Sequence, residues 1–189
     1  MKRFFSGLRK KASKTAVKDD DRFGTGLWRH NRDRFIRAVD RYYSTAVALH
    51  VARGSGGTAP GAASVGSPDN EATAASAKDP VDVIVDGTHR LNALVEVVDD
   101  LTAALHARHP VTGQVVPGPA RRAVGDVPEL LTKASSKVGE AVLAASMARS
   151  EGPSGRSIDS SAEATVRFIS DAGELLGRAQ AIIARVEPS

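Results

Sequence analysis

The sequence predicts an all-α fold, a four-helix up-and-down type bundle with a disordered basic N-terminal tail and a long flexible linker between helices one and two. Apolar residues recur at three- and four-residue intervals in four segments, and no segment shows the sustained alternation of a strand. Stretches rich in Pro and Gly separate these segments. We therefore divide the chain into a tail, helix one, a linker and a three-helix remainder, at 1–26, 27–53, 54–79 and 80–189.

The tail begins with a basic amphipathic segment over residues 1–18. When this segment is plotted as a helix, Phe4, Phe5 and Leu8 gather on one side and every Lys and Arg falls outside it. Such a pattern is typical of a helix that lies at a membrane surface. A segment this short is marginally stable alone in water, so we expect it to order only on its partner. The candidate membrane- or polyanion-binding residues are Lys2, Arg3, Phe4, Phe5, Leu8, Arg9, Lys10, Lys11, Lys14 and Lys18.

Helix one covers 27–53, and Thr25 is its expected N-cap. It carries four of the eight aromatic side chains, while the later helices are filled with Val, Leu, Ile and Ala. A core of small side chains can accept large ones from a single helix, which favours a structural role for the aromatic group Trp28, Phe35, Tyr42 and Tyr43. The expected core positions of helix one are Trp28, Phe35, Ile36, Val39, Tyr43, Ala46, Val47 and His50.

The same helix also permits a functional interpretation. A helix tethered by a long linker can leave its groove and present aromatic anchors to another protein. Arg residues form a stripe on this helix, and Asp33 is spaced to pair with both Arg29 and Arg37. The candidate partner-binding residues are Trp28, Arg34, Phe35, Arg37, Arg41 and Tyr42.

Residues 54–79 have the composition of a flexible linker. Val65 is their only large apolar side chain, so they cannot bury enough surface to offset the entropy lost on ordering. A coil of this length can span the bundle in either direction, which leaves open whether helix two lies antiparallel to helix one.

The three later helices each have a recognisable start, with a capping side chain followed by an early Pro or an acidic residue. Their expected spans are 80–109, 127–149 and 160–187. The expected caps are Asp79 before Pro80, Asp126 before Pro128 and Glu129, and Ser160 with Glu163 as a capping box.

Charge is unevenly distributed along the chain. Residues 1–53 hold 14 basic and 5 acidic side chains, a net charge of +9, whereas residues 54–189 hold 12 and 17, a net charge of −5. An asymmetry of this size favours an acidic partner, because it sets the field that an approaching molecule meets. Anionic lipid, nucleic acid and an acidic protein all belong to that class.

Composition limits the remaining classes of function. The chain has no Cys, so it has no disulfide and no thiolate site, which suits a reducing cytoplasm. No apolar run is long enough for a secretory signal or a membrane-spanning helix. The richness in Ala, Val, Arg, Gly and Asp resembles that of proteins from high-GC bacteria.

Enzymatic and metal-binding interpretations have little support. Asp82, Asp86, His89 and Glu96 lie along the polar side of helix two, but a bundle metal site draws ligands from several helices and the last two helices have no His. A phosphotransfer role for His89 rests on a likeness of three residues. No phosphate loop or nucleophile elbow is present. We expect no catalytic residue, no metal ligand and no cofactor.

The sequence therefore predicts a non-enzymatic helical adaptor or scaffold in the cytoplasm, attached peripherally to an anionic membrane surface by its basic amphipathic N-terminus and binding an unknown protein through its bundle. The alternative is a nucleic-acid-binding accessory protein that uses the same tail and the Arg stripe of helix one. A third interpretation treats residues 1–18 only as a solubilising terminus.

Overall fold

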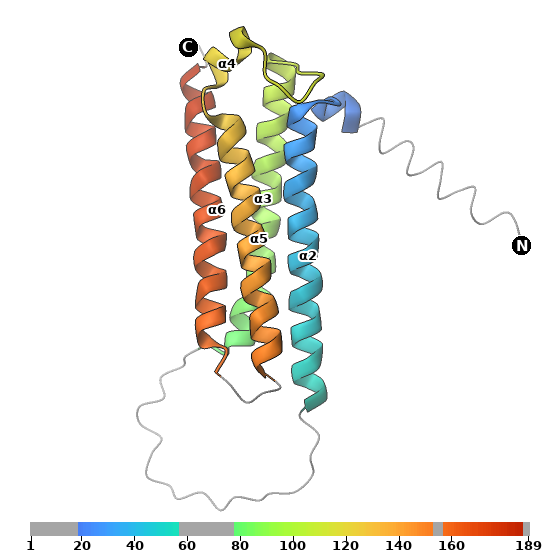
Figure 1. Cartoon of the computed structure of the whole chain (residues 1–189), viewed down its shortest axis with the longest axis vertical. Helices are drawn as coiled ribbons and strands as arrows, with labels where there is room; N and C mark the ends of the chain where they lie inside the picture. The colour runs from blue at the N-terminus through green and yellow to red at the C-terminus, as the bar shows by residue number, and fades with distance from the viewer. Residues whose placement is uncertain (1–18, 57–77, 153–156, 187–189) are drawn as a thin grey trace, which may run out of the picture.

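Helices account for all the regular secondary structure in the residues that the structure describes, which are 19–56, 78–152 and 157–186 of a computed structural model (Figure 1). The prediction of an all-α protein is confirmed for these residues. Four long helices lie side by side: α2 (Leu27–Gly56), α3 (Pro80–Arg108), α5 (Val127–Glu151) and α6 (Asp159–Val186). The predicted disordered tail at 1–18 and most of the predicted linker, 57–77, lie outside the described residues.

The structure also contains helical segments that the sequence did not predict. Residues 19–23 are helical and precede α2, and α4 (Gly118–Val124) forms inside the stretch expected to be a loop. Pro119 occupies the first turn of α4, where its missing N–H costs nothing, and Ala and Arg residues that favour helix follow it. Gly125, with φ of 53°, ends α4 in a conformation that other residues rarely adopt.

The four long helices stand at the corners of a square. α2 contacts α3 and α5, and α6 also contacts α3 and α5. The colours of Figure 1 show that α2 and α5 run in one direction and that α3 and α6 run in the other. Helices α2 and α3 are therefore antiparallel neighbours, which decides the question that the linker left open. Helices α3 and α5 follow one another in the chain but lie across the diagonal, joined through α4.

The core pairs large side chains from α2 with small ones from α5. Trp28, Phe35 and Tyr42 of α2 are fully buried, and α5 contributes a row of buried alanines. Burial of one aromatic side chain contributes about 1.5–3 kcal/mol, so these three dominate the contribution of α2 to stability. The core assignment of Trp28 and Phe35 is confirmed. The buried alanines are Ala134, Ala141, Ala144, Ala145 and Ala148.

The buried face of α2 is rotated from the expected one by about one residue. Tyr42 and Leu49 are buried, whereas Tyr43 is 57% exposed, Val47 is 43% exposed and His50 is also exposed. The core assignments of Tyr43, Val47 and His50 were therefore wrong. With 3.6 residues per turn, the positions 28, 35, 42, 46 and 49 form one stripe along α2. The buried hydroxyl of Tyr42 has a hydrogen-bond partner there, because it donates to the carbonyl of Ile84 at 2.7 Å.

One of the four expected caps has the predicted geometry. Asp79 Oδ1 accepts a hydrogen bond from the N–H of Val81 at 2.7 Å, ahead of Pro80 in the first turn of α3. Asp126 precedes α5 but makes no side-chain cap bond, and Glu129 binds Arg121 of α4 instead.

The other two caps were wrongly assigned. The N–H of His30 bonds to Gly26 rather than Thr25, and that of Ala162 bonds to Ile158, so Ser160 already lies inside α6. The neighbouring Ser161 donates to Glu151 at the end of α5, at 2.7 Å.

Among the described residues, no helix has an apolar stretch of the length needed to cross a bilayer.

Candidate functional site

The site of interest is the joint at which the basic segment 1–18 meets the bundle. Residues 19–26, assigned to the tail by the sequence analysis, pack against α2 and α3 instead. Phe23 is 1% exposed, and the guanidinium groups of Arg22 and Arg32 lie 4.9 and 4.0 Å from the centre of its ring. Each cation–π contact contributes about 0.5–2 kcal/mol, depending on desolvation. Residues 19–26 therefore form a packed anchor directly after the basic segment in the chain, and we call this anchor the root.

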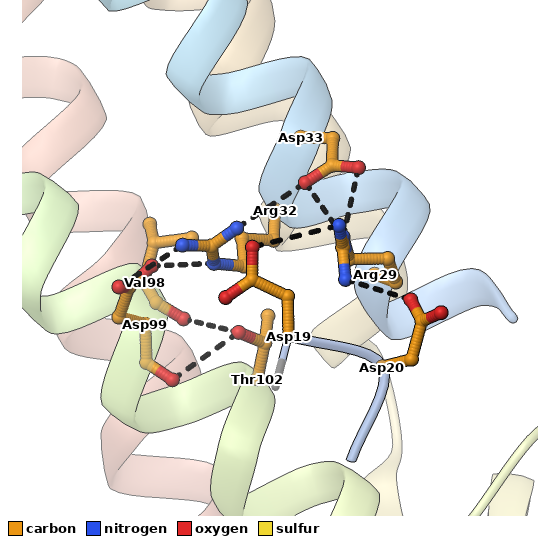
Figure 2. Close-up of polar contacts among 8 residues, drawn as sticks. All are labelled: Asp19, Asp20, Arg29, Arg32, Asp33, Val98, Asp99 and Thr102. Carbon is orange, nitrogen blue, oxygen red and sulfur yellow. Dashed lines mark hydrogen bonds and ion pairs between the residues drawn. The ribbon is translucent and has the colours of Figure 1, made fainter. Parts of the chain in front are cut away.

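A network of charges holds the root to α2 (Figure 2). Arg29 Nε donates to both oxygens of Asp33, at 2.9 and 3.0 Å, and Arg29 Nη1 donates to Asp20 at 3.1 Å. Asp19 lies 3.6 Å from the Nη2 atom of the same guanidinium. The Arg29 side chain is only 20% exposed, so three carboxylates compensate a partly desolvated cation. The expected pairing of Asp33 with Arg29 is present, but its second partner is Arg32 rather than Arg37.

The network continues from α2 to α3. Arg32 Nε donates to Asp99 at 2.7 Å, with a second bond from Nη2 at 3.3 Å, and the Arg32 side chain is 13% exposed. Burial alone would lower the pKa of Arg32, but the hydrogen bond and charge of Asp99 raise it overall. A bidentate, partly buried Arg–carboxylate pair has a fixed geometry. Arg22 adds an exposed contact to Asp100 at 3.3 Å.

Two glycines permit the turn between the root and α2. Gly24 has φ of 70°, and a Cβ added there would lie 2.6 Å from the imidazole of His106. A Cβ added at Gly26 would lie 2.0 Å from the carbonyl oxygen of Val111. The backbone of the root therefore lies directly against the end of α3 and the loop that follows it.

Hydrogen bonds close the same end of the bundle. The N–H of Leu27 donates to the carbonyl of Gly113 at 2.9 Å, and the indole N–H of Trp28 donates to the carbonyl of His109 at 2.8 Å. Trp28 is thus both a core residue and the link between α2 and the loop after α3.

The predicted site residues fall into three groups. The membrane- or polyanion-binding residues, from Lys2 to Lys18, lie outside the described residues. Trp28, Phe35 and Tyr42 are packed in the core and offer no surface in this arrangement, so their role as partner-binding residues stays a prediction that requires α2 to leave the bundle. Arg34, Arg37 and Arg41 are exposed.

The Arg stripe and the root lie on different sides of α2. Arg34 reaches Ser136 of α5 at 3.5 Å, and Arg37 and Arg41 share its side of the helix by their spacing. The root instead faces α3 through Arg22 and Asp100. The nucleic-acid interpretation uses the tail and the Arg stripe together, and the stripe lies on a different side of α2 from the root.

Three contributors to the site were missed from sequence. Phe23 stands between acidic residues and a glycine, where an isolated aromatic gives no periodic signal. Arg32 and Asp99 are 67 positions apart, so their pairing depends on the packing of α2 against α3. The Asp19-Asp20-Asp21 run, which follows the basic segment directly in the chain, supplies two of the anchoring carboxylates.

In the described part of the chain, no three or more His, Cys, Asp or Glu side chains are grouped so that they could hold a metal ion. Of the residues considered from sequence, His89 is exposed, and Asp86 is bound by Lys78, whose hydrogen bond lowers the pKa of the Asp86 carboxyl. Comparison with known protein families, with curated proteins and with solved structures finds no match for this chain.

Proposed function

We propose that this protein is a non-enzymatic helical adaptor that attaches to an anionic membrane surface through residues 1–18 and presents its bundle to another protein. The observation that carries the proposal is the root: a packed anchor joins a strongly basic segment to a chain whose residues 54–189 carry a net charge of −5. A terminus that served only to keep the chain soluble would not require a buried Phe23 and a partly buried charge network at its base.

The charge of the tail is sufficient for reversible attachment. Residues 1–18 contain seven Lys or Arg and no acidic residue. Each contributes about 1 kcal/mol near an anionic leaflet. Insertion of Phe4, Phe5 and Leu8 adds about 1.5–3 kcal/mol each. The entropy lost as the segment orders on the membrane offsets part of this gain, so we expect reversible binding.

The bundle offers apolar surface for a protein partner. Tyr43, Val47 and Val51 follow one another at four-residue spacing on α2 and are 57%, 43% and 59% exposed. On α5, Leu143 and Met147 are 65% and 57% exposed and line a groove shared with Phe168 of α6. Exposed apolar residues grouped in this way are typical of interaction surfaces. In this arrangement they, rather than the buried aromatics, are the partner-binding candidates.

Flotation with liposomes tests the membrane proposal. The full chain should float with vesicles that contain anionic lipid at low salt and should remain behind with neutral vesicles. A chain that begins at Asp19 keeps the whole root and should lose flotation while retaining its helical circular dichroism. Equal flotation of the two chains would refute the proposal.

Two further variants separate the contribution of charge to vesicle binding from the contribution of apolar insertion. Lys10→Gln with Lys11→Gln should weaken binding and reduce its salt dependence, whereas Phe4→Ala with Phe5→Ala should weaken it at all salt concentrations. Tight, steeply salt-dependent binding of DNA or RNA without vesicle binding would instead favour the nucleic-acid accessory role.

A further inference from the structure

A groove between α3 and α6 has the chemistry to bind a basic amphipathic segment. Its volume is about 670 Å³, within the range of pockets that bind organic ligands. The apolar part is formed by Pro80, Val83, Ala162 and Val166, which are buried or half-buried. The groove therefore has room for several large apolar side chains.

Acidic side chains surround this apolar floor. Asp159, Glu163, Asp171 and Glu174 line the groove, against two basic residues, Lys78 and Arg167. Lys78 is already bound to Asp86, and Asp171 is 3.5 Å from Lys137 of α5. Glu163 and Glu174 have no ion-pair partner within the described ranges. The groove thus presents uncompensated negative charge beside apolar surface.

The groove extends from below the root toward the end of the bundle where α3 and α6 begin, so residues 1–18 would have to run along the bundle to fill it. Asp19 binds Arg29, and the adjoining Arg32 binds Asp99 of α3, as Figure 2 shows. Leu94 of α3 packs next to Gly173, so Glu174 lies at the level of Leu94, five residues below Asp99. The far end of the groove, at Pro80, is nineteen residues from Asp99, or about 28 Å along α3. Eighteen residues cover about 27 Å as a helix and about 60 Å when extended, so residues 1–18 can reach the groove.

The charge of residues 1–18 makes this segment the best match for the groove between α3 and α6. This segment combines Phe4, Phe5 and Leu8 with seven cations, which complements an apolar floor with acidic walls. Residues 57–77, which directly precede the groove residue Lys78 in the chain, contain no Lys or Arg and carry Asp69 and Glu71. They cannot neutralise the groove.

We infer that the groove between α3 and α6 is an intramolecular docking site for residues 1–18, so that the bundle and the membrane compete for the same segment. The membrane part of this inference rests on the proposed function. Docking withholds the segment from lipid, and the apparent vesicle affinity falls by the fraction of molecules in the docked state. A protein that occupies the groove would then release the segment for membrane binding.

Disulfide cross-linking tests the docking, since the natural chain has no Cys. Ser6→Cys introduces a thiol in the tail, and Ser170→Cys introduces one at an exposed position in the groove. The control pairs Ser6→Cys with Ser150→Cys, which is also exposed but lies on α5. Under mild oxidation the groove pair should form an intramolecular disulfide about tenfold faster than the control pair. Equal rates would overturn the inference, as would cross-linked dimers, which would assign the groove to the tail of a second copy.

Neutralising the groove gives a second measurement. Glu163→Gln with Glu174→Gln should slow the cross-link about three- to tenfold, because two charge contacts are lost. The same substitutions should strengthen vesicle binding by a similar factor, and anionic vesicles should slow cross-linking of the parent pair. Unchanged cross-linking in the Gln variant would exclude a role for these carboxylates.

The two proposals can fail separately. Vesicle binding that depends on residues 1–18, without selective cross-linking to Ser170→Cys, would overturn only the docking. Selective cross-linking in a chain that never floats with vesicles would keep the docking and refute the membrane proposal.

Discussion

Gly87 shows how a single residue brings three helices of this bundle together. A Cβ added to this α3 residue would lie 2.3 Å from the hydroxyl of Tyr42 and 2.9 Å from Cδ1 of Ile169. Gly87→Ala should therefore destabilise the fold by about 1–3 kcal/mol, because overpacking exceeds the gain in helix propensity. Gly139→Ala on α5 meets nothing within 4 Å and should stabilise by about 0.5–1 kcal/mol. Urea unfolding of both variants measures the contrast, and stabilisation by both would contradict the packing.

The buried hydroxyl of Tyr42 makes the free energy of unfolding depend on pH in the alkaline range. Burial raises the pKa of its hydroxyl, with a small opposing effect from the charge of Arg90. Since the native state holds this proton more tightly, the contribution is complete below the ordinary tyrosine pKa of about 10 and is lost as the pH rises above that value, by up to about 1.4 kcal/mol per pH unit. Tyr42→Phe should remove this dependence and cost about 0.5–1.5 kcal/mol near neutral pH. Tyr43→Phe, at the exposed neighbour, should retain it; a loss of the dependence in both variants would reject the assignment.

At the scale of an element, the start of α3 differs from the start of α5. Asp79 makes a side-chain cap bond and also lies 3.1 Å from Arg53, whereas Asp126 makes no cap bond and its contact with Arg121, at 3.7 Å, is largely exposed. Asp79→Ala should cost about 1 kcal/mol, and Asp126→Ala should change stability by less than about 0.5 kcal/mol.

Asp79→Asn separates the two contributions at this position, because an amide oxygen can still cap the helix but no longer carries charge for Arg53. Thermal unfolding that ranks Asp79→Asn with Asp79→Ala would assign the loss to the ion pair instead of the cap.

The extent to which the sequence predicted these elements depends on the kind of signal. The three- and four-residue spacing of apolar side chains and the capping, Pro and Gly residues at helix ends located the helices. Both signals act within a few residues, as at Asp79-Pro80. The face of α2 was misjudged because adjacent residues of similar chemistry, Tyr42 and Tyr43, cannot be ranked without knowing where α3 lies. α4 was missed since seven residues bounded by Pro and Gly have the composition of a loop. The root was missed because its bonds join residues far apart in the chain.

For the whole molecule, the antiparallel packing of α2 and α3 makes the length of residues 57–77 dispensable. Gly56 and Pro80 lie at the same end of the bundle, and neighbouring helix axes are about 8–10 Å apart, a gap that a few residues can span. Replacing residues 57–77 with six Gly and Ser residues should leave the helix content unchanged and raise stability by roughly 1 kcal/mol through lower loop entropy. Unfolding, or a dimer on size-exclusion chromatography, would show that α2 and α3 are not joined in this way.

The root and the connection between α2 and α3 lie at opposite ends of the bundle, and this makes the bundle a spacer. α2 has 30 residues, which corresponds to a rod of about 45 Å. If lipid binds residues 1–18 and the bundle stands perpendicular to the membrane, a protein bound at the α2–α3 connection lies several nanometres from the lipid headgroups. This distance exceeds the Debye length in physiological salt. The partner would then meet the protein outside the electric field that attracted the tail.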